Sequence, residues 1–362
     1  MESPLKYFAD VRDPRVDRTR EHLLEEILLL TIAAVLSGAS GWNEIEDYGR
    51  TKLEWFKSFL RLPAGIPSHD TFNRVFSALD PEELEKGFVA WVASIAKLTA
   101  GEVVSLDGKA LRGTRGKKAI VHMVSAWANT NNLVLAQRRV DEKSNEITAI
   151  PKLLQALELS GTVVTIDAMG CQRTIAEQIV ERKADYILAV KENQGHLLEE
   201  VKDSFRMLVT DSVAEQVDCG HGRVERRTCS VIGDLTLLEK PFQWASLKGL
   251  VRIQSERFHK ATGKTENETR YYITSLSPEA TKLNQAIRQH WGIENKLHWV
   301  LDVAFGEDLS RKRAGHAAQN FSLINRLALN LLKQDKTSKL GVHGKRLKAG
   351  WDNNYLLKVL AN

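Results

Sequence analysis

The sequence SPEATKLNQAIRQHWGIENKLHWVLDVAFGED fills residues 277–308, and its pattern directs how the rest of the chain is interpreted. It predicts a helix, because Ser277 can cap one and Pro278 suits the first helical position. Glu294 falls on an apolar stripe at helical spacing, where an ionised carboxylate is costly unless a cation or donors meet it. The stripe consists of Leu283, Ile287, Trp291, Leu297 and Leu301. Taken alone, this pattern favours a salt bridge from Glu294 to His290 or His298 over a metal ligand.

A glycine and two tryptophans near Glu294 allow further predictions about packing. Glycine in a helix interior costs about 1 kcal/mol, so Gly292 predicts close packing or a distortion just before Glu294. Trp291 and Trp299 are expected in the core, in preference to a role in stacking against a flipped base.

The composition is that of an ordinary soluble globular protein, with 43% hydrophobic and 27% charged residues among 362. A net charge of +5 permits nucleic acid as a partner without requiring it. Three cysteines suit a reducing cytosol better than a disulfide framework. The longest apolar run, residues 27–39, is too short to span a bilayer, and the N-terminus lacks the pattern of a secretory signal. We therefore expect a cytoplasmic protein without a membrane partner.

Residues 1–100 are predicted to be all helical. Asp80, Pro81 and the acids after them form a strong helix start, and breaks rich in glycine and proline separate the segments. Short helices with tight turns could form a helix-turn-helix DNA-binding unit or a plain helical bundle, and the spacing alone does not decide between them. The expected helices span residues 20–37, 42–60, 68–79 and 81–98.

From residue 102 the periodicity changes to that of a mixed α/β sheet. Two β-rich runs around a turn cluster indicate a hairpin, and helices between the later strands indicate crossover connections. The expected strands span residues 103–106, 119–127, 133–140, 162–166 and 186–190, and the expected helices span 147–157 and 172–182. A β-rich insertion follows at 196–276, with a helix at 197–208 and strands near 224–232, 250–258 and 269–273.

Beyond Asp308 the charge changes sharply. Residues 309–350 hold ten basic side chains and one acid, Asp335, so this segment is more positive than the whole chain. A helix is expected at residues 317–333. A run of charge is usually a solvated face, but this run directly follows a candidate acidic site, which favours a phosphate-binding surface.

Three acids stand out by their position. Asp107 and Asp167 each end a predicted strand, at the edge of the sheet where the sites of α/β proteins form. Glu294 lies on the helix beyond the insertion. Carboxylates suit Mg²⁺, and two such ions can promote phosphodiester cleavage. Either aspartate alone is best explained as a turn-forming acid, but the three acids together indicate a metal site.

Six motifs give the chain a resemblance to a known family. They are SLDGKALRGT, KSNEITAIPKLL, TIDAMGCQRTIAEQI, DYILAVKENQ, HGRVERR and HWGIENKLHWVLDVAFGED. Together they resemble the bacterial DDE transposases of insertion sequences, and most closely the H-repeat-associated group linked to rearrangement-hot-spot elements. The segments YFADVRDPR and HLLEEILLLTIAAVLSGASGWNEI resemble the N-terminal associated domain of that group, so the resemblance covers nearly the whole chain.

This resemblance implies a fold and an activity. The catalytic core would be ribonuclease H-like, with Asp107, Asp167 and Glu294 as the catalytic DDE triad and as the ligands of Mg²⁺ or Mn²⁺. The implied reaction is metal-dependent cleavage of double-stranded DNA at the terminal inverted repeats of an insertion sequence. Transfer of the 3′-hydroxyl to target DNA would follow. Synapsis of two ends implies a homodimer on DNA.

One departure from the family concerns the contacts with DNA. The broader group carries a Tyr-x-x-Arg-x-x-x-Glu-x-x-x-x-x-x-Lys signature, and here the places of Tyr, Arg and Lys hold Ile287, His290 and Leu301. Other cations must then contact DNA. Two of them lie in residues 108–113, which lack the spacing of a P-loop. The candidates for DNA binding are Lys109, Arg112, Lys191, Arg223, His290, Lys296, His298, Arg311, Lys312 and Arg313.

The expected α/β chain has four parts. Residues 1–100 form a helical domain for DNA binding or assembly, residues 101–195 and 277–308 form the catalytic core, 196–276 form the β-rich insertion, and 309–362 form a basic helical region. Two other functions stay open. One is a domesticated descendant that binds DNA without transposing, and the other is a nuclease of the same fold that cuts without joining.

Overall fold

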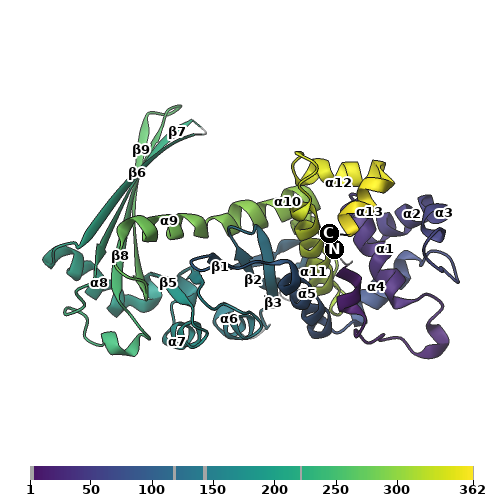
Figure 1. Cartoon of the computed structure of the whole chain (residues 1–362), viewed down its shortest axis with the longest axis horizontal. Coiled ribbons are helices and arrows are strands. Elements are labelled where there is room, and N and C mark those ends of the chain that lie inside the picture. Colours follow the sequence, from purple (N-terminus) through teal and green to yellow (C-terminus); the bar gives the residue numbers. More distant parts are fainter. Residues whose placement is uncertain (1–3, 117–119, 142–144, 221, 362) are drawn as a thin grey trace.

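The chain folds into an elongated molecule with one nine-stranded sheet through its middle (Figure 1). The computed structural model describes residues 4–116, 120–141, 145–220 and 222–361. A twisted arm, formed by the last four strands of the sheet, lies at one end, and helices from the first and last parts of the sequence lie at the other (Figure 1). Across these described ranges, no helix is both long and apolar enough to cross a membrane.

The N-terminal helices begin where the sequence provides caps. The Ser68 hydroxyl caps α4 (His69–Ala78), and the Asp80 carboxylate caps α5 (Pro81–Ile95). Each side chain accepts a hydrogen bond from a backbone N–H that has no partner within its own helix. The helix predicted at residues 42–60 is divided into two shorter helices. The remaining bounds are Leu24–Leu36 for α1, Trp42–Thr51 for α2 and Leu53–Lys57 for α3.

Helices from the C-terminal segment pack among the N-terminal ones. α11 (Ala317–Gln334) is buried along most of its length and contacts α1, α4 and α5. α12 (Val342–Trp351) and α13 (Asn353–Leu360) also contact α1. Residues 1–100 and 309–362, which the sequence presents as two regions, therefore contribute to one apolar core.

Four cations of the basic C-terminal segment are buried, so they do not form the phosphate-binding surface predicted there. Lys312 donates to a backbone carbonyl in the loop before α2 at 2.6 Å. Arg326 donates to the Glu307 carboxylate at 2.8 Å. Lys345 and Arg346 likewise donate to backbone carbonyls. Protein acceptors replace water around these cations, which is the condition for burying a charge.

The central sheet is built from apolar runs that are buried on both faces, as is typical of strands joined by helical crossovers. Its elements are β1 (Val103–Leu111), β2 (Val121–Ala128), β3 (Leu133–Arg139), α6 (Glu146–Gln155), β4 (Val163–Ile166), α7 (Arg173–Glu181) and β5 (Asp185–Val190). β1, β2 and β3 pair antiparallel, and β1, β4 and β5 pair parallel. The predicted meander followed by helical crossovers is confirmed.

The arm continues the same sheet. β9 pairs antiparallel with β5, and β8, β7 and β6 follow in that order. The bounds are Gly195–Met207 for α8, Ser212–Gly220 for β6, Arg223–Ile232 for β7, Gly249–His259 for β8 and Lys264–Thr274 for β9. The sequence did not predict β6, because this edge strand is mostly polar and its side chains are largely exposed.

A long helical segment follows the arm and crosses the face of the sheet opposite α6 and α7 (Figure 1). It consists of α9 (Ala280–His290), a π-helical turn (Glu294–His298) and α10 (Trp299–Phe305). Helix α9 begins after Glu279, so the predicted cap at Ser277 and first position at Pro278 are wrong. The apolar side of α9 packs on the sheet, which fixes the position of the residues that follow it.

Candidate metal centre

The register of the sheet places two aspartates side by side. Parallel pairing of β1 with β4 ends at Leu106 and Ile166, and the next residue on each chain segment is Asp107 or Asp167. β1 continues along β2 beyond Asp107, so this residue does not end its strand as predicted. Asp167 does follow the last residue of β4, and its carboxylate accepts a hydrogen bond from the Ala168 N–H at 2.7 Å.

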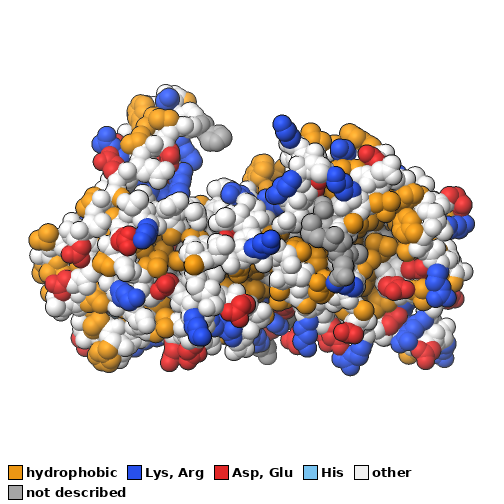
Figure 2. Space-filling model, in the orientation of Figure 1, with side chains coloured by type: hydrophobic (Ala, Val, Ile, Leu, Met, Phe, Trp, Pro, Cys, Tyr) orange, Lys and Arg blue, Asp and Glu red, His pale blue; other side chains and the backbone are white. Residues whose placement is uncertain are grey.

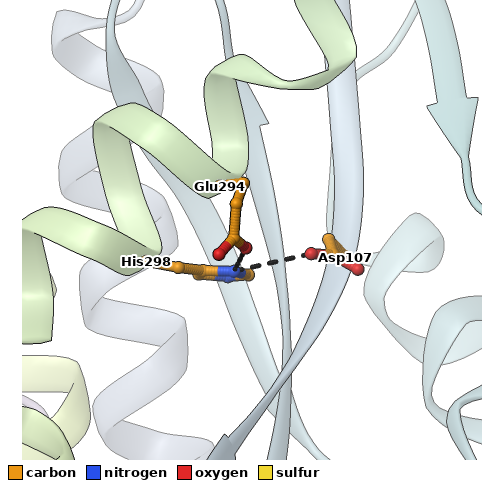
Figure 3. Close-up of side chains that lie close together, drawn as sticks. All are labelled: Asp107, Glu294 and His298. Carbon is orange, nitrogen blue, oxygen red and sulfur yellow. Dashed lines mark hydrogen bonds and ion pairs between the residues drawn. The ribbon is translucent and has the colours of Figure 1, made fainter. Parts of the chain in front are cut away.

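Glu294 comes to this edge from the long helical segment, and His298 lies between Glu294 and Asp107 (Figure 3). His298 Nδ1 is 3.2 Å from Glu294 Oε2 and 3.5 Å from Asp107 Oδ2. Glu294 and His298 are the first and last residues of the π-helical turn, so they project toward the same side. The predicted contact between Glu294 and His298 is therefore present, and it includes Asp107.

The three carboxylates have different electrostatic surroundings. Burial raises the pKa of Asp107, and the charges of Glu294 and Asp167 add to that rise. The hydrogen bond with His298 lowers the pKa of Glu294, whose side chain is 55% exposed and not core-facing as predicted. Burial acts to raise the pKa of Asp167, but a backbone N–H and the charge of Lys191 outweigh it and lower this pKa. A cation among these groups would relieve the repulsion at Asp107.

A fourth carboxylate, Glu146, belongs to the same cluster. It is the first residue of α6, and a Cβ atom at Gly108 would overlap its carboxylate. Burial raises the pKa of Glu146, and the charges of Asp107 and Asp167 raise it further. Glu146 lies in the motif KSNEITAIPKLL but was not predicted as a site residue, because an acid at the start of a helix is usually explained by the helix dipole. Glu146 is identified by the close approach of its carboxylate to Gly108, which is visible only in the folded structure.

The donor atoms fit a small divalent cation. One ligand atom each from Asp107, Glu294 and His298 lie within 4.8 Å of one another. Asp167 adds a carboxylate directly after the neighbouring strand, β4. Carboxylate oxygens suit Mg²⁺ or Mn²⁺, and the imidazole nitrogen is a softer additional donor. These residues could therefore hold a metal ion.

The carboxylates open onto a cavity of about 690 Å³ that extends along the ends of β5 and β9. Such a hollow beside acidic groups can admit a substrate. Its lining includes Asp107, Asp167 and Glu294 together with the cations Lys191, Lys202 and Arg270.

His290 also lines this cavity, but it is not a cation there. Its Nδ1 lies 2.9 Å from the Thr165 hydroxyl. Burial lowers the pKa of His290 to about 4, even though the charge of Asp167 acts in the opposite direction. The ring is therefore neutral near pH 7, so it cannot supply the phosphate-binding charge predicted for it.

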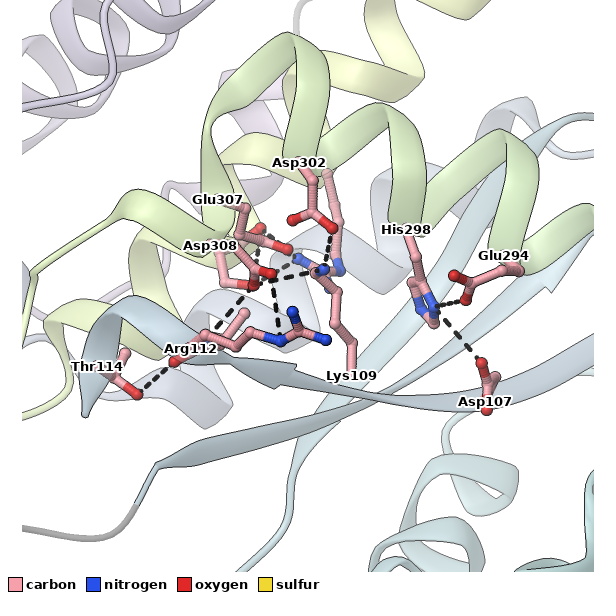
Figure 4. A network of polar contacts seen from close by, with 12 residues as sticks. Asp107, Lys109, Arg112, Thr114, Glu294, His298, Asp302, Glu307 and Asp308 are labelled. Carbon is pink, nitrogen blue, oxygen red and sulfur yellow. Dashed lines mark hydrogen bonds and ion pairs between the residues drawn. The ribbon is translucent and has the colours of Figure 1, made fainter.

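Lys109 and Arg112 lie in a second polar network further along β1 (Figure 4). Lys109 is buried, with its ammonium 2.6 Å from Asp302 Oδ2 and 3.6 Å from Asp308 Oδ1. Arg112 is exposed, with Nε 3.6 Å from Asp308 Oδ2. Lys109 on β1 and Arg112 in the turn after it both bind acids of the segment that includes α10, and of the two only Arg112 is accessible to a ligand.

The other residues predicted to contact DNA differ in how exposed their side chains are. His298 and Lys312 are buried, and burial lowers the pKa of Lys312 to about 8. Lys191 is half-exposed and lies 3.3 Å from Asp167 Oδ1. The remaining candidates have exposed side chains: Arg223, Lys296, Arg311 and Arg313.

Gly292 shows the close packing predicted for it, and a distortion follows. A Cβ atom here would overlap Asn129 Oδ1, and the π-helical turn starts two residues later. Trp291 is half-buried, with the Arg270 guanidinium stacked on its ring at 4.7 Å. Trp299 is 60% exposed, so the core position predicted for it is wrong.

Comparisons with known proteins agree on one family. Residues 99–331 match the model described as "Transposase DDE domain", and residues 5–92 match the model described as "DDE_Tnp_1-associated". The chain is 43% identical to "Putative transposase YncI" of Escherichia coli O157:H7, over 100% of this chain and 95% of that protein. It is 42% identical to "H repeat-associated putative transposase YhhI" of Escherichia coli K12, over 99% and 97%.

Among solved structures, the chain has a distant likeness to a piggyBac transposase, determined as a synaptic complex with hairpin DNA by cryo-electron microscopy. The TM-score is 0.48 at 12% sequence identity, and the alignment covers 100% of this chain and 82% of that one.

Proposed function

The chain belongs to the family of DDE transposases, and we propose that it cleaves DNA at the ends of an insertion sequence and joins the 3′-hydroxyl to target DNA. The observation that supports this activity is the convergence of Asp107, Asp167 and Glu294 from distant parts of the sequence beside one cavity. Asp107 and Glu294 share a single imidazole, that of His298, which cannot neutralise both. Carboxylates left with excess negative charge at a cavity are suited to bind divalent cations.

Three residues of the chain would hold the metal ions. Asp107 and Asp167, which directly follow the paired residues Leu106 and Ile166, would hold both ions, and Glu294 would complete the coordination of one. When bound, Mg²⁺ or Mn²⁺ would lower the pKa of the attacking hydroxyl group and neutralise charge on the scissile phosphate.

The other residues would contribute positioning and charge. Asp107 lies within a paired strand, so its backbone is held on one side by β2. His298 bridges Asp107 and Glu294 and thereby sets the separation of strand and helix. Lys191 lines the cavity beside Asp167, where it can stabilise a negative oxygen of the substrate. Catalysis of this kind rests mainly on orientation and on preorganised charge.

We also infer a ribonuclease H-like core. The sheet supports this inference, because three antiparallel strands are followed by two parallel strands reached through helical crossovers. The positions of the acids, on β1, after β4 and on the helical segment with Glu294, support it as well. The core would comprise residues 101–195 and 277–308, with 196–276 as its insertion. Residues 1–100 and 309–362 share a core, and we propose that they act together in DNA binding or in assembly of a dimer.

We propose that the exposed cations contact double-stranded DNA. They are Arg112, Lys191, Arg223, Lys296, Arg311 and Arg313. Long exposed cations release counterions when they meet phosphates, so each would strengthen binding in a manner that depends on salt.

A strand-transfer assay tests the proposed activity. The wild-type protein, DNA carrying the terminal inverted repeats of the element, and Mg²⁺ or Mn²⁺ should give cleaved and joined products. Asp107→Asn, Asp167→Asn and Glu294→Gln should each reduce cleavage by about a hundredfold or more, because each removes a charged ligand. Asp203→Asn is a matched control, since Asp203 lies on α8 in an exposed pair with Arg206.

The products of this assay separate the three functions. Joined product supports a transposase, cleavage without joining supports a nuclease, and a metal-independent gel shift without cleavage supports a DNA-binding descendant. If the three triad variants all cleaved as well as Asp203→Asn, the assignment of the metal centre would be wrong.

A further inference from the structure

A second hollow lies beside the catalytic cavity, between the arm and the long helical segment. Its volume is about 620 Å³. In the space-filling view, lysine and arginine side chains gather around the hollow that separates the arm from the rest of the molecule (Figure 2). We name this hollow the arginine cleft after its lining cations, which are Arg223, Arg227, Arg257, Arg270, Arg288 and Lys296.

The strand periodicity brings these arginines to one face of the arm. Arg223, Glu225 and Arg227 alternate along β7 and therefore point to the same face. Arg257 on β8 lies directly opposite Glu225 in the register. Arg288 reaches the same place from α9, so the cleft draws its cations from both the sheet and the helix.

The cations of the cleft exceed the carboxylates that accompany them. Glu225 receives three guanidinium groups, with nitrogen to oxygen distances of 3.2 Å to Arg257, 3.3 Å to Arg288 and 3.7 Å to Arg227. Glu268 pairs with both Arg257 and Arg270, and Asp218 pairs with Arg288. Six lining cations therefore face three carboxylates, so the cleft keeps a positive charge that a further anion would balance.

Arg227 is a buried cation of this cleft. Its side chain is 6% exposed, and its Nη1 has no hydrogen-bond partner among the residues that the structure describes. Leaving a charged donor buried and unsatisfied is costly. A phosphate oxygen would satisfy it, because guanidinium and phosphate groups match in geometry and charge.

The arginine cleft adjoins the catalytic cavity. Arg270 and Trp291 line both hollows, and the Arg270 guanidinium covers the Trp291 ring. A polyanion that occupies the cleft would therefore pass next to Glu294, which lines the cavity beyond this pair. A free phosphate ion would fill only part of a hollow of about 620 Å³ with cations along its length.

We propose that the arginine cleft binds the phosphate backbone of duplex DNA next to the scissile bond. This inference rests on the proposed transposase function, and it assigns part of the DNA binding to a surface of the arm. The contacts are made to phosphates, so they hold DNA of any sequence and contribute a salt-dependent share of the affinity.

Fluorescence anisotropy with a labelled mixed-sequence DNA duplex, in EDTA and over a range of salt concentrations, tests the proposal. Arg227→Gln and Arg288→Gln should each weaken binding by about three- to tenfold and reduce the slope of log affinity against log salt by about 1. Arg206→Gln is the matched control, because Arg206 is an exposed arginine on α8 that pairs with Asp203 outside the cleft. It should bind as the wild type does.

Three outcomes would overturn the proposal. They are unchanged affinity and slope in both cleft variants, equal weakening in the Arg206→Gln control, and competition by inorganic phosphate at concentrations that leave nonspecific salt effects small. If Arg227→Gln fails to fold, Arg288→Gln and Arg223→Gln still decide the matter, because both side chains are at least partly exposed.

The failure of this proposal is distinguishable from failure of the proposed function. A wild type that cleaves and joins DNA while the cleft variants bind normally would contradict only the cleft. A wild type that binds DNA through the cleft but neither cleaves nor joins would contradict only the transposase activity.

Discussion

Replacing Gly292 with alanine should destabilise the protein, although such a change inside a helix usually stabilises by about 1 kcal/mol. A Cβ atom at this position would overlap Asn129 Oδ1. The Asn129 side chain is buried, and its amide donates to the Val103 carbonyl at 3.0 Å and to Ser105 Oγ at 2.8 Å. The added methyl group must therefore displace either Asn129 or the helical segment that carries Glu294.

The expected magnitude follows from the two hydrogen bonds of Asn129. Each is worth about 1 kcal/mol, and more when a buried partner is left unsatisfied. Losing both costs about 2 to 4 kcal/mol, against a helix gain of about 1 kcal/mol. We therefore expect the free energy of unfolding of Gly292→Ala to fall by about 1 to 3 kcal/mol. Cleavage should fall further than this loss explains if Glu294 also moves.

Urea denaturation followed by circular dichroism measures this change, and Gly195→Ala is its control. Gly195 begins α8 with helical backbone angles, and a Cβ atom there would meet nothing within 4 Å. The control should be neutral or stabilised by up to about 1 kcal/mol. Combining Gly292→Ala with Asn129→Ala should relieve the overlap, so the pair should cost less than the sum of the single changes. A Gly292→Ala variant more stable than the wild type would refute this reasoning.

Other perturbations test the carboxylate cluster and the helical end. Glu146→Ala removes the fourth carboxylate, and Gly108→Ala displaces it with a methyl group, so each should weaken Mn²⁺ binding by about tenfold in calorimetry. The double variant should lose no more affinity than either single variant, and additive losses would contradict the coupling of the two positions. His298→Ala should weaken Mn²⁺ binding about ten- to a hundredfold in an electron paramagnetic resonance titration without DNA, whereas unchanged affinity would show that the imidazole only bridges Asp107 and Glu294. Burial raises the pKa of Glu85 from 4.5 to about 7, so its neutral form stabilises the fold at low pH. The free energy of unfolding should decline by about 3 kcal/mol as the pH rises through this window, and Glu85→Gln should flatten the decline in urea titrations at several pH values.

The order of strands and helices could be predicted because it depends on short-range patterns. Apolar runs and caps marked most elements of residues 81–190 to within a few residues. The position of Asp107 and Asp167 at one edge of the parallel strands was also predicted, since each comes after an apolar run, and the two directly follow the paired residues Leu106 and Ile166. Glu146 and Arg227 could not be identified in this way. The role of Glu146 depends on its close approach to Gly108, and that of Arg227 on a buried donor atom that the sequence does not reveal.

The burial of charge was the main feature that the sequence could not predict. Lys312 lies over the rings of Trp42 and Phe321, and its nearest acceptor belongs to a loop hundreds of residues earlier in the chain. A count of basic residues treats such a lysine as exposed, whereas its environment depends on tertiary contacts.

Trp299 shows a different error. It stands two residues from both Leu297 and Leu301, which are fully buried, so helical spacing alone would have placed it on the opposite face. Its expected burial relied on the residue type and ignored its position in the helix. Its actual exposure leaves an aromatic surface one turn beyond Glu294.

The core shared by the first and last helices has a consequence for biosynthesis. The ribosome makes α1 early, yet α1 also packs against α11, α12 and α13, which are synthesised hundreds of residues later. Until these helices are made, the nascent chain must carry α1 with part of its apolar surface uncovered, and such surfaces recruit chaperones or promote aggregation. A truncated mRNA that ends before α11 would therefore encode a polypeptide that contains the acidic residues of the triad but cannot complete the core of the helical end.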